Sequence, residues 1–320
     1  MNHLHSEGAL AEFAHGTQRM RIAVTGSTGL IGSMLCRILA EAGHDIIHLV
    51  RDARNTTTYD RCHWIPTAGI QQLDKCQQLD AVVNLAGRSI GQSRWSVREK
   101  RLLRESRVAA TSILASQLAS LAQPPHTFVS ASAIGIYGNR GDEIVTEESE
   151  TGQDFLAQLA SQWEQACLPL SNIGARVVHA RLGIVLSPAG GALKKLYPIF
   201  RFGLGGPLGS GKQFWSWVSL NDVVRAMNFL LVNPDCVGPF NISAPKPVTN
   251  GEFTRKLASA MHRPAAIRVP APVLRMALGE MADGMLLSSC RALPQRLVNQ
   301  GFQFTHPTLV ECLTRIMSEK

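Results

Sequence analysis

One short glycine-rich segment constrains the fold of this chain more than any other feature. Residues 21–25 form an apolar, β-rich run, and the segment Thr25-Gly26-Ser27-Thr28-Gly29-Leu30-Ile31-Gly32 follows it without interruption. Beyond the glycines, apolar residues recur with helical period until Gly43. Glycines between a strand and a helix allow backbone N–H groups and the helix N-terminus to approach a pyrophosphate. A glycine triplet alone is weak evidence, but this order of elements predicts a dinucleotide-binding loop rather than a merely tight turn.

The rest of the chain continues the alternation of strands and helices. We expect further strands over residues 45–50, 61–65, 81–85, 127–130, 176–180 and 240–242. We expect helices from the arginine-rich segment to about residue 121, over residues 155–168, after Asn221-Asp222, and after a capping box at Thr249 to Glu252. This alternation predicts an α/β fold with a Rossmann-type, doubly wound parallel sheet, whose ligands bind at the carboxyl ends of the strands.

Changes in composition divide the chain into three parts. Residues 1–19 carry scattered His, Glu and Gly, and we expect them to be a poorly ordered N-terminal extension. Residues 20–183 contain the alternating strands and helices and are expected to form the dinucleotide-binding domain. After Gly183 the sequence becomes rich in Gly, Pro and aromatic residues. We therefore expect residues 184–320 to form a smaller C-terminal substrate-binding lobe.

Composition excludes several classes of protein. Polar residues interrupt every apolar run before it reaches the roughly 20 residues that a membrane span needs. The seven cysteines are far apart and form no Cys-x-x-Cys pair, and the ten histidines form no His-Glu-x-x-His motif. These features predict a soluble protein of the reducing cytoplasm that has no metal site and does not bind membranes.

The net charge of +8 raises the question of nucleic acid. Much of the charge lies in one predicted helix, where Arg94, Arg98, Arg101 and Arg104 recur at helical spacing. No nucleic-acid-binding motif accompanies them. We therefore interpret these arginines as a solvated helix face and expect no nucleic-acid partner, although anionic small ligands fit the charge.

The end of the second predicted strand indicates which dinucleotide binds. A protein that binds NAD commonly places Asp or Glu there, on the ribose hydroxyls. This chain has Val50 and then Arg51, which favours a 2′-phosphate and hence NADP(H), with NAD as the less favoured cofactor. Two alternatives stay open, because Arg51 could be a surface residue that never meets ligand, and Asp52 could serve the ribose.

A second glycine-rich segment imitates a different nucleotide-binding motif. Residues 206–212, Gly-Pro-Leu-Gly-Ser-Gly-Lys, have the spacing of a P-loop, but Gln213 replaces the Ser or Thr that would bind magnesium. No buried strand leads into the segment, and no obvious helix follows it. We therefore expect a loop over the substrate crevice rather than a site of nucleotide hydrolysis.

Successive motifs resemble those of one large family. They are Thr25 to Gly32, Asn84-Leu85-Ala86-Gly87, Ser130-Ala131-Ser132 through Tyr137-Gly138, Arg181 to Leu186, the glycine-rich run from Phe202 to Gly211, Trp217 to Asp222 and Arg291 to Leu297. Together they are similar to the atypical extended short-chain dehydrogenases/reductases of the NAD(P)-dependent epimerase/dehydratase type, from Met20 onward. The resemblance implies phosphate contacts from Gly26, Thr28, Gly29, Leu30, Ile31 and Gly32, a 2′-phosphate contact from Arg51, adenosine-side contacts from Leu85, Ala86 and Gly87, and nicotinamide-side contacts from Ser130, Ala131, Arg181, Gly183 and Ile184.

The catalytic part of the pattern departs from that family. Family members use Tyr-x-x-x-Lys, in which the Lys lowers the pKa of the Tyr for proton transfer, but the corresponding helix of this chain places Leu156 and Ala160 there. Ser132 could still bind a substrate oxygen, although an alternative alignment puts Ala133 at that place. Tyr137 is the nearest remaining phenol, and a structural role for it is at least as well supported as acid/base work.

These observations leave two principal hypotheses. The first is an NADP(H)-binding oxidoreductase, epimerase or dehydratase that acts on a small substrate, with nucleotide-linked compounds as one candidate class. The second is a regulatory protein that senses NADP(H) or a metabolite without turnover. A third hypothesis, that the protein binds nucleic acid, rests on charge alone. The substrate, the reaction direction, the catalytic competence and the oligomeric state stay open, with a dimer among the alternatives.

Overall fold

The fold is built on one eight-stranded sheet with the strand order β12-β8-β6-β5-β1-β2-β3-β4. A computed structural model describes residues 19–51 and 60–318. Every pair in the sheet is parallel except β3 and β4 at one edge, which are antiparallel. The strands of this sheet are β1 (Arg21–Thr25), β2 (Asp45–Val50), β3 (Asp60–Ile65), β4 (Gly69–Ile70), β5 (Ala81–Asn84), β6 (Thr127–Ala133), β8 (Arg176–Leu182) and β12 (Gly238–Ile242). The predicted α/β, doubly wound class is confirmed.

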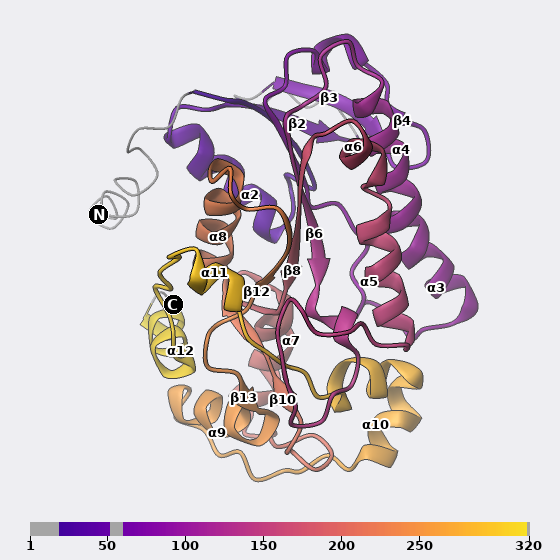
Figure 1. Ribbon diagram of the computed structural model, residues 1–320. Coiled ribbons are helices and arrows are strands. Elements are labelled where there is room, and N and C mark those ends of the chain that lie inside the picture. Colours follow the sequence, from indigo (N-terminus) through magenta and orange to yellow (C-terminus); the bar gives the residue numbers. More distant parts are fainter. Residues whose placement is uncertain (1–18, 52–59, 319–320) are drawn as a thin grey trace.

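Helices cover both faces of this sheet (Figure 1). One face carries α2 (Leu30–Glu41) and α8 (Leu220–Val232). The other carries α3 (Val97–Arg104), α4 (Ala110–Ala119), α5 (Phe155–Gln165) and α6 (Leu168–Asn172). The arginine-rich helix, expected to be continuous, is interrupted between α3 and α4 by a π-helical turn, η2 (Glu105–Ala109).

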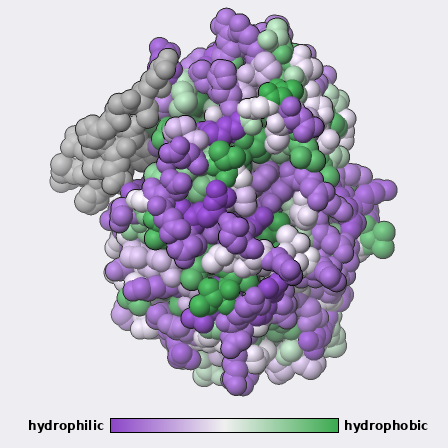
Figure 2. Space-filling model, viewed as in Figure 1, coloured by the Kyte–Doolittle hydropathy of each residue, from purple (hydrophilic) through white to green (hydrophobic). Residues whose placement is uncertain are grey.

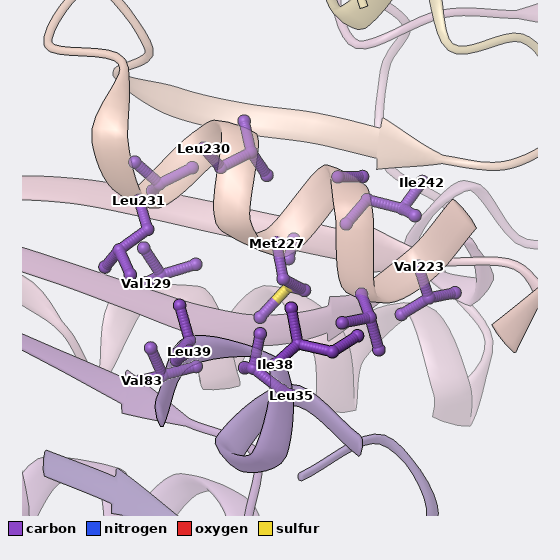
Figure 3. Packing of buried hydrophobic residues seen from close by; sticks show 14 of the residues in the cluster. Leu35, Ile38, Leu39, Val83, Val129, Val223, Met227, Leu230, Leu231 and Ile242 are labelled. Atoms are coloured by element: carbon purple, nitrogen blue, oxygen red, sulfur yellow. The ribbon is translucent and has the colours of Figure 1, made fainter. Parts of the chain in front are cut away.

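Apolar side chains seal each face. Between the sheet and the first pair of helices, Leu35 and Leu39 of α2 pack with Val223 and Met227 of α8, and Val83 of β5 lies beside Leu39 (Figure 3). A separate cluster forms on the other face from strand, α4 and α6 residues: Ile47, Val82, Leu114, Leu118, Phe128, Cys167 and Leu170. The two clusters fix the relative positions of the strands, and thereby of the loops at the strand ends.

The strand order reverses between β1 and β5. From β1 the chain builds outward through β2 and β3, whereas β5, β6, β8 and β12 build in the opposite direction. In a doubly wound sheet, loops leave this point to opposite faces and open a crevice at the carboxyl ends of the strands. The fold therefore places the ligand crevice beside Thr25 and Asn84, the last residues of these two strands.

The C-terminal half packs below this edge of the sheet as drawn in Figure 1. Its elements outside the sheet are β9 (Ile184–Ser187), α7 (Gly191–Arg201), β10 (Phe214–Trp215), β11 (Trp217–Ser219), β13 (Val248–Thr249), α9 (Asn250–Ala260), α10 (Ala271–Leu278), the π-helical η4 (Ala282–Leu287), β14 (Arg291–Ala292), α11 (Gln295–Asn299) and α12 (Leu309–Ser318). Three short elements belong to the N-terminal half. They are η1 (Leu73–Cys76), which precedes β5, η3 (Ile134–Tyr137), and β7 (Ile144–Val145), which pairs with β14. Because α8 and β12 return to the central sheet, the chain after residue 184 contributes to both halves.

Several expectations concern parts of the molecule that the structure describes only partly. The extension expected over residues 1–19 lies outside the described residues except for Arg19, and Asp52 lies outside them as well.

Within residues 19–51 and 60–318, no helix is long and apolar enough to cross a membrane, and no group of three or more His, Cys, Asp or Glu side chains could hold a metal. On the face shown in Figure 2, hydrophobic residues form separate small patches in a largely hydrophilic surface.

Candidate functional site

The glycine loop turns the chain sharply between β1 and α2. Gly26 has a φ of +65°, and the N–H of Gly29 donates to the carbonyl oxygen of Gly26 at 2.9 Å. A Cβ atom on Gly26 would lie 2.8 Å from the carbonyl carbon of Leu85. A Cβ atom on Gly32 would lie 2.3 Å from the oxygen of Gly26. These two glycines therefore allow the loop to pack against β5 and α2, as a tight phosphate-binding turn requires.

The N-terminus of α2 is open toward an anion. Gly29 is the N-cap, no side chain caps the helix, and its first turn contains no acidic residue. The unpaired N–H groups and the helix dipole therefore give this end a partial positive charge. Ser27 Oγ is buried beside it without a hydrogen-bond partner among the described residues. Thr28 and Gly29 are exposed, so the residues present fit a bound phosphate group.

A buried polar network supports the floor of the crevice. The hydroxyl of Thr25 donates to Asn84 Oδ1 at 2.7 Å and accepts the N–H groups of Leu85 and Ala86. Asn84 Nδ2 donates in turn to Thr111 of α4 and to Ser130 of β6. The network fixes the loop 85–87 against the glycine loop, because every polar atom of Asn84 is used within the protein.

Arg51 lies at the same edge of the sheet. It is exposed and directly follows β2, which pairs with β1 in parallel register, Thr25 opposite Leu49. The structure thus brings Arg51 to the carboxyl-end side of β2, one strand away from the glycine loop.

The ends of β6 and β8 carry a buried ion pair. Arg181 Nε and Nη2 donate to the two oxygens of Glu164 at 2.8 and 2.9 Å, and Ser132 Oγ donates to Glu164 Oε1 at 2.7 Å. Burial raises the pKa of Glu164, but the hydrogen bonds and charge of Arg181 outweigh burial and keep that pKa below its usual value. Ser132 and Arg181 are both buried, so their polar groups are directed into the protein.

Tyr137 belongs to the same buried cluster. It lies in η3 with no exposed surface, its hydroxyl donates to Asn241 Oδ1 at 2.7 Å, and it accepts a hydrogen bond from Arg181 Nη1 at 2.9 Å. Burial raises the pKa of Tyr137 to about 12, because the phenolate would be poorly solvated. Both hydrogen-bonding roles of the phenol are therefore used inside the fold.

Helix α5 presents two apolar side chains near this cluster. Leu156 is partly buried beside Gly135, and Ala160 is buried. Next to the N-terminus of α5 is a cavity of about 320 Å³. The Rossmann half and the C-terminal lobe both line it: Trp95, Asn139, Asp154, Phe155, Arg275, Glu280, Asp283, Gly284, Leu287 and Ser288.

The C-terminal half also closes onto the phosphate end of the crevice. A Cβ atom on Gly190 would lie 3.1 Å from the side chain of Leu30, the first residue of α2. Lys195 of α7 donates to the carbonyl oxygen of Gly91 in the loop after β5. Gly183 and Ile184 pair with the backbone around Ser216 and Ile242, where a Cβ on Gly183 would lie 2.8 Å from Ser216 O.

The arginine stripe has a further role in this arrangement. Arg94, Arg98, Arg101 and Arg104 are exposed, as expected, but Arg94 also donates to the carbonyl oxygen of Met276 at 2.9 Å. Arg94 precedes the N-cap Ser96 and therefore lies outside α3, so the expected helical stripe holds only for the other three arginines. Lys100 of α3 forms an ion pair with Glu280. The stripe therefore contacts the α10–η4 segment of the C-terminal lobe, which helical periodicity alone does not reveal.

The strand order, the crevice at the β1–β5 switch point and the glycine loop inside it define a doubly wound NAD(P)-binding protein. The model of the NAD dependent epimerase/dehydratase family matches residues 22–243, and a domain of unknown function, DUF1731, matches residues 269–316. The chain therefore belongs to the NAD-dependent epimerase/dehydratase family, as an atypical extended short-chain dehydrogenase/reductase. The predicted resemblance is confirmed.

Curated relatives agree with this assignment. An epimerase family protein of Mycobacterium bovis is 45% identical over 292 residues, which cover 91% of this chain and 96% of the relative. The epimerase family protein YfhF of Bacillus subtilis is 33% identical over 304 residues, covering 94% and 99% of the two chains.

Two solved structures are similar along nearly the whole chain. The human epimerase family protein SDR39U1, determined with NADPH, has a TM-score of 0.84 at 29% identity and covers 94% of this chain and 100% of its own. A nucleoside-diphosphate sugar epimerase from Corynebacterium glutamicum has a TM-score of 0.80 at 32% identity, covering 97% of this chain and 61% of its own.

Proposed function

We propose that this protein binds NADP(H) across the carboxyl ends of β1, β5, β6 and β8. The observation that carries the proposal is the uncapped N-terminus of α2 behind the Gly26–Gly32 turn, since backbone N–H groups and the helix dipole favour a phosphate there. The proposed contacts are Gly26, Thr28, Gly29, Leu30, Ile31 and Gly32 for the phosphates, Leu85, Ala86 and Gly87 on the adenosine side, and the backbone of Ser130, Ala131, Arg181, Gly183 and Ile184 toward the nicotinamide.

Arg51 supports the choice of NADP(H) over NAD. It is an exposed cation one strand from the glycine loop, where a ribose 2′-phosphate would gain a charge-assisted hydrogen bond. The human relative was determined with NADPH, which agrees with this assignment. We also assign the protein to the cytoplasm. The proposed NADP(H) cofactor and the free thiols of the cysteines support this assignment, because thiols stay reduced in that compartment.

We propose a small, nucleotide-linked substrate in the cavity between the two halves. The cavity has aromatic walls at Trp95 and Phe155 and charged groups from the C-terminal lobe. The C. glutamicum protein, by its description, acts on nucleoside-diphosphate sugars. A bound nicotinamide would supply hydride transfer for epimerase, dehydratase or reductase chemistry. Residues of both halves of the chain would bind and orient the substrate between them.

The test of the cofactor proposal is a calorimetric titration with NADPH and NADH. We expect NADPH to bind about 10- to 100-fold more tightly, and Arg51→Ala to remove most of that difference while leaving NADH affinity unchanged. Arg98→Ala is the matched control, because Arg98 is an exposed cation on α3 away from the glycine loop. Equal affinities of the unmodified protein for NADPH and NADH would remove the role proposed for Arg51.

A second candidate function, sensing without turnover, has its own support. Ser132 and Tyr137 donate to Glu164 and Asn241 inside the fold, and Leu156 and Ala160 cannot transfer protons. General acid/base catalysis contributes about 10² to 10⁴ in rate, so its loss would slow any reaction strongly. We therefore assign Ser132 and Tyr137 to the support of the fold.

A single-turnover experiment separates the two candidates. Protein saturated with NADPH or NADP⁺ is mixed with sugar-nucleotide and alcohol substrates, and nicotinamide absorbance and product stereochemistry are followed. We expect slow turnover or none. Turnover near 10 s⁻¹ that is unchanged in Ser132→Ala and Tyr137→Phe would establish an enzyme with an acid/base group elsewhere. Turnover that falls in these variants while they stay folded would instead return Ser132 and Tyr137 to catalysis.

A further inference from the structure

An arginine lies against the loop that follows β5. Arg107 is the third residue of the π-helical turn η2, which interrupts the helix between α3 and α4. Its Nη2 donates to the carbonyl oxygen of Arg88 at 2.7 Å, and a Cβ atom on Gly87 would lie 3.4 Å from its Cζ. Single π-helical turns inside longer helices occur frequently at functional sites.

The guanidinium also contacts α5. Its Cζ lies 5.2 Å from the ring centroid of Trp163, within the range of a cation–π interaction. The indole N–H of Trp163 donates to Thr111, which joins the Asn84 network below the glycine loop. Arg107 is therefore held between the β5 loop and α5, on the side of the crevice opposite α2.

The charge of Arg107 has no carboxylate to balance it. Among the described residues no Asp or Glu oxygen lies within 4 Å of its guanidinium, and its only other hydrogen bond is a long one, 3.4 Å, to Ser106 Oγ. Two other arginines are fully engaged: the buried Arg181 binds both oxygens of Glu164, and the partly buried Arg176 donates to three backbone carbonyls.

This imbalance costs free energy in the unliganded protein. Burial alone lowers the pKa of Arg107 to about 10, because the charged guanidinium is poorly solvated and no acidic neighbour compensates. A partly buried cation without a counter-ion destabilises a fold, whereas the same cation facing a ligand anion contributes to binding. Arg107 is only partly buried, so part of its surface stays accessible to a ligand.

We infer that Arg107 is a phosphate-binding residue of the crevice, whose guanidinium pairs with a phosphate oxygen that the bound ligand supplies. The planar fork of arginine matches phosphate oxygens in a way that a lysine ammonium does not. The inference rests on the proposed function, because a nucleotide is what brings the phosphate. Two sources share this chemistry: the pyrophosphate of the dinucleotide and the diphosphate of a nucleotide-linked substrate.

Binding of two probes to one set of variants tests the inference. Arg107→Met removes the charge, Arg107→Lys keeps it, and Arg98→Met makes the same charge change on the exposed face of α3. NADPH is titrated into the free protein, and UDP into protein saturated with NADPH. We expect Arg107→Met to weaken one probe about 10- to 100-fold, Arg107→Lys to recover part of the loss, and Arg98→Met to stay within about twofold of the unmodified protein.

The probe that weakens identifies the source of the phosphate. Loss of NADPH affinity assigns Arg107 to the dinucleotide, and loss of UDP affinity alone assigns it to the substrate. If UDP does not bind the unmodified protein, the NADPH titration decides alone. Unchanged affinity of Arg107→Met for every probe that binds overturns the inference. Failure of the unmodified protein to bind either NADPH or NADH overturns the proposed function instead.

Stability of the unliganded variants separates a binding role from a structural one. If Arg107 serves a ligand, Arg107→Met keeps or raises the midpoint of urea unfolding, because a side chain without charge replaces a partly buried cation that has no counter-ion. If Arg107 only supports the fold, the midpoint falls while affinity per folded molecule is unchanged, and that result also overturns the inference.

Discussion

The glycine-rich segment at residues 26–32 borders a crevice, whereas the one at residues 203–211 is filled by other parts of the protein. In the second segment a Cβ on Gly206 would lie 1.7 Å from the carbonyl oxygen of Ile267, and a Cβ on Gly205 would lie 2.6 Å from the ring of Phe200. In the first segment, a Cβ on Gly29 would be much less crowded. Apart from its chain neighbours and its own helix, the described residues place only one atom within 4 Å of it, the oxygen of Gly26 at 3.1 Å.

The elements that follow the two segments explain this difference. The first leads into α2, whose uncapped N-terminus needs an electrostatic partner, while the second leads into the strand β10, which pairs with β13. A glycine-rich sequence therefore indicates only that something approaches the backbone closely. Whether a ligand or another part of the chain does so depends on the next element.

The largest effect should come from the segment that the protein itself fills. We expect Gly206→Ala to lower the free energy of unfolding by about 3 kcal/mol, because its Cβ would overlap the Ile267 carbonyl and the backbone would have to shift. Urea unfolding followed by circular dichroism measures this loss. NADPH affinity per folded molecule should not change, and a loss of affinity without a loss of stability would contradict the comparison.

A smaller loss of stability is expected inside the first segment. Gly32→Ala would place a Cβ 2.3 Å from the oxygen of Gly26, and we expect a cost of about 2 kcal/mol, partly offset by the better helix propensity of alanine. Since the displaced atom belongs to the glycine turn, NADPH affinity should fall as well. Measuring unfolding and binding on the same sample tests this coupling, and a variant with normal affinity would show that the turn is not part of the phosphate site.

The middle glycine should separate binding from stability. We expect Gly29→Val to weaken NADPH binding about 100-fold, which corresponds to about 2.7 kcal/mol, because a branched side chain would occupy the space assigned to the pyrophosphate. The midpoint of unfolding should change little, since only the Gly26 oxygen is near. Gly29→Ala is the graded control and should lose less affinity. A folded Gly29→Val protein with normal affinity would place the phosphate site elsewhere.

Much of the sheet could be predicted from local sequence. Short apolar runs such as 21–25 and 81–85 are strands within one residue of the expected bounds, and the Thr249–Glu252 capping box begins α9 as expected. The return of β12 and α8 to the central sheet could not be assigned, because it depends on contacts between residues far apart in the chain. The π-helical turn at Glu105–Ala109 has no periodic signal of its own.

The candidate site divides in the same way. The glycine turn is predictable, because its geometry arises from neighbouring residues. The engagement of Ser132 by Glu164 and of Tyr137 by Asn241 was not predictable, since each pair joins different elements and each partner residue is common in many contexts. For the same reason the sequence does not distinguish Arg107 from the other arginines, because its lack of a nearby carboxylate depends on the folded structure.

The smallest effect is expected at Lys212, the lysine of the apparent P-loop. Its side chain is exposed, and the segment before it leads from α7 and a loop rather than from a buried strand, so it has no phosphate cradle to complete. We expect Lys212→Ala to leave NADPH affinity and the unfolding midpoint within error, since isolated surface substitutions usually change stability by less than about 0.5 kcal/mol. The stricter test adds ATP and magnesium to the unmodified protein and follows phosphate release. Hydrolysis that disappears in Lys212→Ala would mean that both glycine-rich segments bind phosphate, and the distinction between them would fail.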